Sequence, residues 1–184
     1  LDGFAGTLTL DPNEQMLAEA TAKIAAQQAQ REALRQLVSA PSVTQDGHSI
    51  RLYANIAGTD DLPLLQESGA EGVGLLRSEF LYLGRSTYPT EDELFESYKT
   101  IVQAMDGREI IIRTLDIGAD KQAYYFDMPP EDNPALGLRA IRLCLTRPIL
   151  FQTQLCAILR ASRYGNVGVM FPMVTGPDEL HRLK

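Results

Sequence analysis

The sequence predicts an α/β fold, the first half of a (β/α)8 barrel of the TIM type preceded by a long linker helix. Short apolar segments rich in β-branched residues alternate with helix-like segments, a pattern typical of parallel strands joined by helices. Polar residues follow the ends of several of these segments, where barrel enzymes place their sites. A complete barrel takes roughly 250 residues, so the stretch 45–184 suffices for about half of one.

An open doubly wound sheet is the alternative architecture. Such a sheet would place a glycine-rich turn after its first strand, where it binds a nucleotide. The corresponding turn here, Ala57-Gly58-Thr59, lacks that fingerprint. The barrel is therefore the favoured prediction.

The first 40 residues are expected to stand apart from the barrel. Residues 1–11 look like the end of a preceding domain. A linker helix is expected over 12–40, with Asp11 as its N-cap, Pro12 in the first helical position and Glu14 completing a capping box. Its narrow apolar stripe suits a helix between domains. Because the chain begins with leucine instead of methionine, we expect it to be a piece of a longer polypeptide.

The barrel elements follow in order along the chain. The pattern predicts strands at 51–57, 73–81, 109–117 and 167–174, of which the last two contain continuous apolar runs. Amphipathic or capped stretches predict helices at 60–68, 90–104, 137–145, 148–163 and 177–184. The short connections favour parallel strands with right-handed crossovers.

The composition excludes several functional classes. The formal net charge of −7 argues against a nucleic-acid surface or an anionic membrane surface. No apolar run is long enough to span a membrane. Cys144 and Cys156 lack CxxC spacing and a nearby histidine, so we expect reduced core residues of a cytoplasmic protein.

Two arginines stand at the ends of predicted strands. Arg113 closes the apolar run 110–112, and Arg77 follows the apolar pair Leu75 and Leu76. Burying a guanidinium is costly unless it is paired, and its planar fork matches phosphate or carboxylate. We therefore predict that both arginines hold one anionic ligand at the mouth of the sheet. The competing interpretation is an ion pair between Arg77 and Glu79.

Other charged and polar residues near the strand ends have simpler interpretations. Asp116 and Lys121 are expected to order the loop after the third strand through a salt bridge, and direct contact with the ligand is the alternative. Arg139 and Arg142 lie three apart on a predicted helix, where an intramolecular ion pair is as reasonable as a ligand role. Asn55 is interpreted as a satisfied polar group of the core.

Five segments resemble one known family: GVGLLRSEFLYL, PTEDELFESYK, IIIRTLDIGADK, EDNPALGLRAIR and LCAILRASRYGNVGVMFPMV. They are similar to the phosphoenolpyruvate-binding barrel of enzyme I of the bacterial phosphoenolpyruvate:sugar phosphotransferase system. The opening LDGFAGTLTLDP is similar to the end of that family's phosphohistidine domain. Ser78 and Ala119 depart from the family's usual Thr and Gly, and these small changes are expected to keep the binding geometry.

The resemblance implies a phosphotransferase of sugar transport. In that family, phosphoenolpyruvate phosphorylates a histidine in the presence of Mg²⁺, and the phosphoryl group then passes to a histidine-containing phosphocarrier protein. A cytoplasmic homodimer is also implied. Arg77 and Arg113 match the two arginines that grip the phosphate, and Arg139 matches a further arginine near the ligand.

The resemblance also implies that this chain carries only part of that machinery. Neither His48 nor His181 matches the phosphorylated histidine, and neither Cys144 nor Cys156 matches the family's catalytic cysteine. The later strands that would carry the Mg²⁺ carboxylates are not in the sequence. We therefore expect no catalytic residue and no metal ligand here, and an inactive fragment that binds phosphoenolpyruvate weakly.

Two other functions stay open at this point. One is a pyruvate phosphate dikinase or phosphoenolpyruvate synthase, enzymes that share the glycine-arginine-glutamate strand. The other is a regulatory paralogue that binds phosphoenolpyruvate without transferring phosphate.

Overall fold

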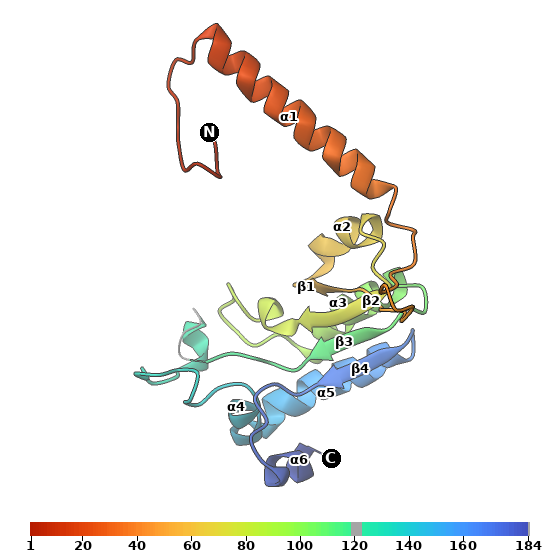
Figure 1. Ribbon diagram of the computed structural model, residues 1–184. Coiled ribbons are helices and arrows are strands. Elements are labelled where there is room, and N and C mark those ends of the chain that lie inside the picture. The colour runs from red at the N-terminus through yellow and green to blue at the C-terminus, as the bar shows by residue number, and fades with distance from the viewer. Residues whose placement is uncertain (119–122, 184) are drawn as a thin grey trace. The chain divides into compact units, whose positions relative to one another are not determined.

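The computed structural model describes residues 1–118 and 123–183 and falls into two compact units, Leu1–Val43 and Thr44–Lys184 (Figure 1). The first unit contains helix α1 (Glu14–Arg35), in which no side chain is buried. Asn13 is its N-cap and accepts a hydrogen bond from the Met16 N–H at 2.9 Å. The predicted cap at Asp11 was wrong, because its φ of 47° is left-handed and an N-cap requires an extended backbone.

The second unit is built on a parallel sheet. In the described residues its strands are β1 (Tyr53–Ile56), β2 (Gly72–Arg77), β3 (Ile110–Arg113) and β4 (Val167–Met170). They lie in the order β1-β2-β3-β4, and each neighbouring pair is parallel. The order does not reverse, whereas a doubly wound sheet reverses its strand order at a switch point. The α/β class and the parallel sheet are confirmed.

All four strands end earlier than predicted, and β2 and β3 do so because their backbone groups find other partners. After β2 the chain enters the 3₁₀ helix η2 (Ser78–Leu81). Beyond β3, the Leu115 N–H donates to a side chain, Gln154 Oε1, at 2.9 Å. The Ile117 carbonyl likewise accepts from the Ala140 N–H at 3.2 Å. These two backbone groups therefore bond to Gln154 and Ala140 instead of to a neighbouring strand.

Helices follow each strand as predicted. The described 3₁₀ and α-helices of this unit are η1 (Thr59–Asp61), α2 (Leu62–Glu67), η2, α3 (Glu91–Ala104), η3 (Tyr124–Phe126), α4 (Ile141–Thr146), α5 (Pro148–Ser162) and α6 (Pro177–Leu183). The helix predicted from residue 137 begins only at Ile141. The cause is Ala140, whose φ of 52° and ψ of −124° cannot continue a right-handed helix.

The core lies between one face of the sheet and the pair of helices α3 and α5, which pack against each other. Ile110 and Ile112 of β3 are fully buried there, together with Tyr98 of α3. Cys144 is also buried, and both cysteines are free. Cys156 is exposed, which corrects the prediction of a core residue: α5 directs Gln154, Ala157, Ile158 and Ala161 inward and leaves position 156 outside. Asn55 is exposed as well, so it is not a core polar group.

The start of α3 is fixed by a capping box, as its sequence predicts. Thr90 Oγ1 accepts from the Glu93 N–H at 3.2 Å, and Glu93 Oε2 accepts from the Thr90 N–H at 2.7 Å. Arg85 Nη2 also donates to Glu93 Oε1 at 2.6 Å. The Thr90 N–H first, and then Arg85, lower the pKa of Glu93 from 4.5 to about 2.

This lowered pKa predicts an acid-sensitive helix start. A carboxylate with a lower pKa in the folded state stabilises the fold fully above its unfolded value of 4.5, and the contribution is lost as pH falls towards 2. The thermal midpoint of the wild-type chain should therefore fall more steeply across this range than that of Glu93→Gln. If the thermal midpoints of the two proteins fell equally with pH, the Glu93 carboxylate would not be the source of the acid sensitivity.

No α-helix among residues 1–118 and 123–183 combines the length and the apolar character required to cross a bilayer.

Candidate functional site

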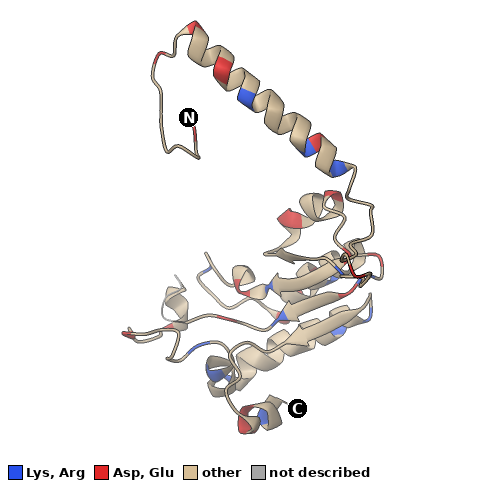
Figure 2. Cartoon of the chain, in the orientation of Figure 1, with Lys and Arg blue, Asp and Glu red and all other residues tan. Residues whose placement is uncertain are grey.

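The ends of β2 and β3 bring two arginines side by side. Arg77 and Arg113 are the last residues of their strands and are register partners in the parallel ladder. Along β3 the side chains alternate, so Arg113 shares a face with half-buried Ile111, while Ile110 and Ile112 enter the core on the other. Figure 2 shows basic residues at both strand ends. The two arginines thus project from the face of the sheet that the helices leave uncovered.

A single buried carboxylate joins the two guanidinium groups. Glu79 is 1% exposed, and its Oε1 lies 3.3 Å from Arg77 Nε and 2.6 Å from Arg113 Nη2. Two groups that donate to one oxygen atom are close enough to contact one small ligand. The Arg77–Glu79 ion pair therefore exists, but it is part of a convergent arrangement and not a substitute for it.

A second carboxylate extends the arrangement to Arg139. Asp116 Oδ2 lies 3.3 Å from Arg113 Nη1, and Asp116 Oδ1 accepts from Arg139 Nε at 2.8 Å. Arg77, Glu79, Arg113, Asp116 and Arg139 thus form a continuous row of alternating charges, which we call the arginine row. Three arginines and two carboxylates leave one net positive charge. The carboxylates hold the guanidinium groups in place, so the row is preorganised.

The three arginines of the row differ in their exposure to solvent. The Arg77 side chain is 36% exposed, whereas those of Arg113 and Arg139 are 16% and 17% exposed. The guanidinium of Arg77 also lies 4.6 Å from the ring centroid of Phe80, which restricts its orientation. Arg77 is therefore the arginine of the row that is most accessible to solvent.

The hydrogen bonding of the row is incomplete. Among the described residues, Arg113 Nε and Glu79 Oε2 are buried without a hydrogen-bond partner. A buried polar atom left unsatisfied costs about 1–3 kcal/mol, and such atoms are concentrated where structure serves function. The row is therefore not arranged for stability alone.

The remaining predictions near the row have different outcomes. Asp116 does make a salt bridge, but with Arg113 and Arg139. Its predicted partner Lys121, like the departure at Ala119, lies outside the described residues. Arg139 precedes α4 instead of lying within it, so it does not share a helix face with Arg142.

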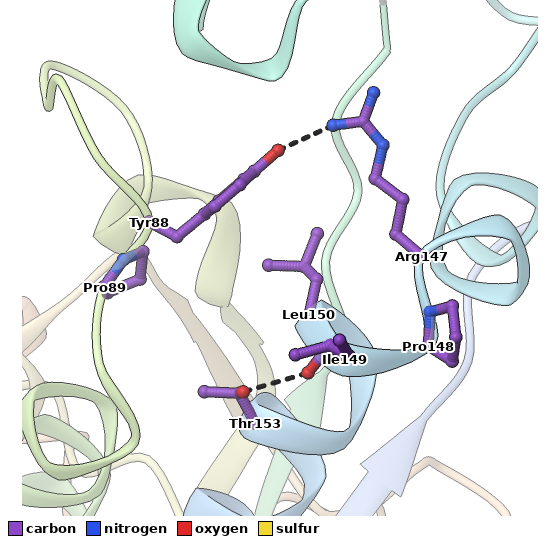
Figure 3. Close-up of a pocket in the computed structure, with 7 residues that line it drawn as sticks. All are labelled: Tyr88, Pro89, Arg147, Pro148, Ile149, Leu150 and Thr153. Atoms are coloured by element: carbon purple, nitrogen blue, oxygen red, sulfur yellow. Dashed lines mark hydrogen bonds between the residues drawn. The ribbon is translucent and has the colours of Figure 1, made fainter.

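A hollow of about 330 Å³ lies away from the row, between the loop before α3 and the start of α5 (Figure 3). Its lining is mainly apolar. Its cation, Arg147, reaches across to Tyr88 Oη at 2.6 Å and also donates to the Phe126 carbonyl at 2.7 Å. Because this guanidinium already has partners and the walls carry no other charge, the hollow suits a small anion poorly.

The buried carboxylates do not fit a magnesium site. In the part of the chain that the structure describes, no three Asp, Glu, His or Cys side chains come together closely enough to hold a metal ion. Glu79 and Asp116 already face arginines, whereas Mg²⁺ needs carboxylates that are free to ligate it. That its ligands lie elsewhere in a longer protein stays a prediction.

Sequence reasoning missed a buried polar cluster beneath the row. Gln154 of α5 is 1% exposed and contacts Ser78, Tyr98 and Leu115. The sequence feature that could have indicated this cluster is a glutamine on the apolar face of α5, between Phe151 and Ala157. A polar side chain at a core position predicts a specific hydrogen-bond partner, although not which one.

A family model and several relatives match the sequence of this chain. The family model of the PEP-binding domain of PEP-utilising enzymes matches residues 31–184. The chain belongs to this family. The match includes all four strands and every member of the arginine row, so the row lies within the PEP-binding domain. The resemblance found in the sequence is confirmed.

Relatives with curated names extend over the whole chain. The chain is 48% identical over all 184 residues to a phosphoenolpyruvate-protein phosphotransferase of Staphylococcus carnosus. It is 47% identical to one of Bacillus subtilis and 48% identical to one of Geobacillus stearothermophilus, again over 184 residues. In each case this chain spans 32% of the relative's length.

Proposed function

We propose that this chain is the part of a phosphoenolpyruvate-protein phosphotransferase that binds phosphoenolpyruvate, and that the arginine row is its anion site. The convergence of Arg77 and Arg113 on one Glu79 oxygen is the observation that supports this most directly. Phosphoenolpyruvate carries a phosphate and a carboxylate, and guanidinium forks match both. Arg139, held by Asp116, would supply a third donor.

The longer protein would take the phosphoryl group from phosphoenolpyruvate onto a histidine and pass it to a histidine-containing phosphocarrier protein for sugar uptake. Phosphoryl transfer requires donors that neutralise charge on the transferred group, and fixed arginines provide them without reorganisation. Residues 1–11 would end a phosphohistidine domain, residues 12–40 would link it, and residues 45–184 would form the first half of a (β/α)8 barrel. A cytoplasmic homodimer belongs to the same proposal.

Mg²⁺ would serve this reaction through ligands supplied from outside this chain. When bound, it would neutralise charge on the phosphate. The contribution of the present residues is to bind and orient the anion and to hold the guanidinium groups at fixed positions.

The direct test is phosphoenolpyruvate binding to this chain, followed by NMR of the arginine Nε–Hε groups. One charge-assisted hydrogen bond contributes about 1.5–3 kcal/mol and association itself costs several, so we expect a dissociation constant on the order of millimolar. Signals of Arg77 and Arg113 should shift on titration, while that of Arg160, which pairs with Glu91 and Asp92, should not. Shifts confined to other arginines would refute the proposed site.

A further inference from the structure

Gln154 makes three hydrogen bonds beneath the arginine row and uses both donors of its amide. Its Oε1 accepts from the Leu115 N–H at 2.9 Å. Its Nε2 donates to Ser78 Oγ at 2.9 Å and to Tyr98 Oη at 3.1 Å. The backbone N–H can only donate, so the amide oxygen must face Leu115 and the NH₂ group must face the two hydroxyls. The orientation of this amide is therefore fixed by chemistry.

These hydrogen bonds join the two chain segments that carry the row. Ser78 lies between Arg77 and Glu79, and its Oγ also donates to the Arg113 carbonyl at 2.6 Å. Leu115 lies between Arg113 and Asp116 in the chain. The regular ladder between β2 and β3 ends at the Arg77–Arg113 pair. Past that pair, Gln154 reaches both segments from α5 and takes the place of ladder hydrogen bonds.

Tyr98 completes the cluster from α3, where its hydroxyl accepts from Gln154 Nε2 and also interacts with the Ser78 side chain. It is fully buried, and burial raises its pKa to about 12, so its hydroxyl stays neutral at physiological pH. Gln154 thus connects the helical layer to both strand ends, while Tyr98 supports Gln154 and Ser78 from α3.

We propose that Gln154 is a positioning residue for the arginine row. It does not contact the ligand; it holds the backbone of the two strand ends so that the guanidinium groups of Arg77 and Arg113 face one anion. This inference rests on the proposed function and adds to it a residue on α5. A displacement of about 1 Å in such a site can lower activity by about 100-fold. Loss of Gln154 should therefore lower activity by displacing Arg77 and Arg113.

The test uses steady-state kinetics of the full-length protein with phosphoenolpyruvate. Gln154→Met keeps the length and loses every hydrogen bond, and we expect kcat/KM for phosphoenolpyruvate to fall by about 10- to 100-fold. The loss should appear in KM for phosphoenolpyruvate, while KM for the phosphocarrier protein stays unchanged. Gln152→Met, at an exposed position of the same helix, controls for the substitution itself.

Two further variants separate positioning from simple loss of stability. Val102→Ala removes buried apolar volume of α3 beside Gly165, at the opposite end of the strands from the row, so it should lower the thermal midpoint and leave kcat/KM nearly unchanged. In an Arg77→Lys background, Gln154→Met should have a smaller effect than in the wild type, because both changes act on one site. If Gln154→Met does not yield folded protein, Ser78→Ala breaks the same link from the strand side and carries the same expectation.

The outcomes distinguish this inference from the function on which it rests. If Arg77→Lys and Arg113→Lys leave kcat/KM unchanged, the proposed function fails. If they lower it but Gln154→Met (or Ser78→Ala) does not, only the positioning role fails. The positioning role also fails if Val102→Ala loses as much activity as Gln154→Met, or if the effects of Gln154→Met and Arg77→Lys simply multiply.

Discussion

Replacing Glu79 with Gln is expected to lower the free energy of unfolding of this chain by about 3–5 kcal/mol, the usual cost of removing one partner from a buried ion pair. Glu79 is 1% exposed and faces both Arg77 and Arg113 through one oxygen. The neutral amide would leave two neighbouring guanidinium groups without their shared counter-charge. Urea unfolding of the two proteins measures the difference.

An anion should reverse part of this loss. Phosphate or phosphoenolpyruvate can supply the negative charge that Glu79→Gln removes, so either should raise the thermal midpoint of the variant more than that of the wild type. Glu91→Gln is the matched control: Glu91 pairs with Arg160, both side chains are 40% exposed, and such pairs contribute about 0–1 kcal/mol. Equal losses in the two variants would show that Glu79 has no special role in holding the arginines.

The second large effect is expected on catalysis. Arg113→Gln in the full-length protein should lower kcat/KM for phosphoenolpyruvate by about 10²–10³-fold, the typical effect of deleting one preorganised electrostatic donor. Arg113 lies at the centre of the row, because it contacts both Glu79 and Asp116. Initial rates measured at several phosphoenolpyruvate concentrations give kcat/KM for the variant and the wild type.

The controls for this prediction address charge and folding separately. Arg113→Lys keeps the charge but loses the planar fork, so it should retain more activity than Arg113→Gln and less than the wild type. Arg160→Gln removes an exposed arginine on α5 and should leave kcat/KM unchanged. A folded Arg113→Gln protein with wild-type kcat/KM would exclude Arg113 from the binding site.

The carboxylates of the row have two opposed effects on affinity. Glu79 and Asp116 hold the arginines in place, which reduces the entropy lost when a ligand binds. They also neutralise two of the three positive charges, which weakens the attraction for an anion. The site is therefore expected to favour correct geometry over tight binding, in agreement with the millimolar affinity proposed for this chain.

Parts of the fold could be predicted because they depend on neighbours in sequence. The alternation of strand-like and helix-like segments predicted all four strands, and the Thr90–Glu93 pair predicted the start of α3. Boundaries were less predictable where distant groups intervene. The strand predicted over 109–117 ends at Arg113, because Gln154 and Ala140 take the hydrogen bonds that a longer ladder would have used.

The sequence by itself determined the family, the α/β class and which arginines stand at strand ends, because local motifs and periodicity specify all three. Only the tertiary structure decided how the arginines are held. Glu79 meets Arg113 across 34 residues, Asp116 meets Arg139 across 23, and Gln154 reaches Ser78 across 76. Such pairings depend on which segments the sheet and helices bring together, and no local pattern specifies them. Ligand binding by Arg77, Arg113 and Arg139 stays a prediction, now with a geometry against which it can be tested.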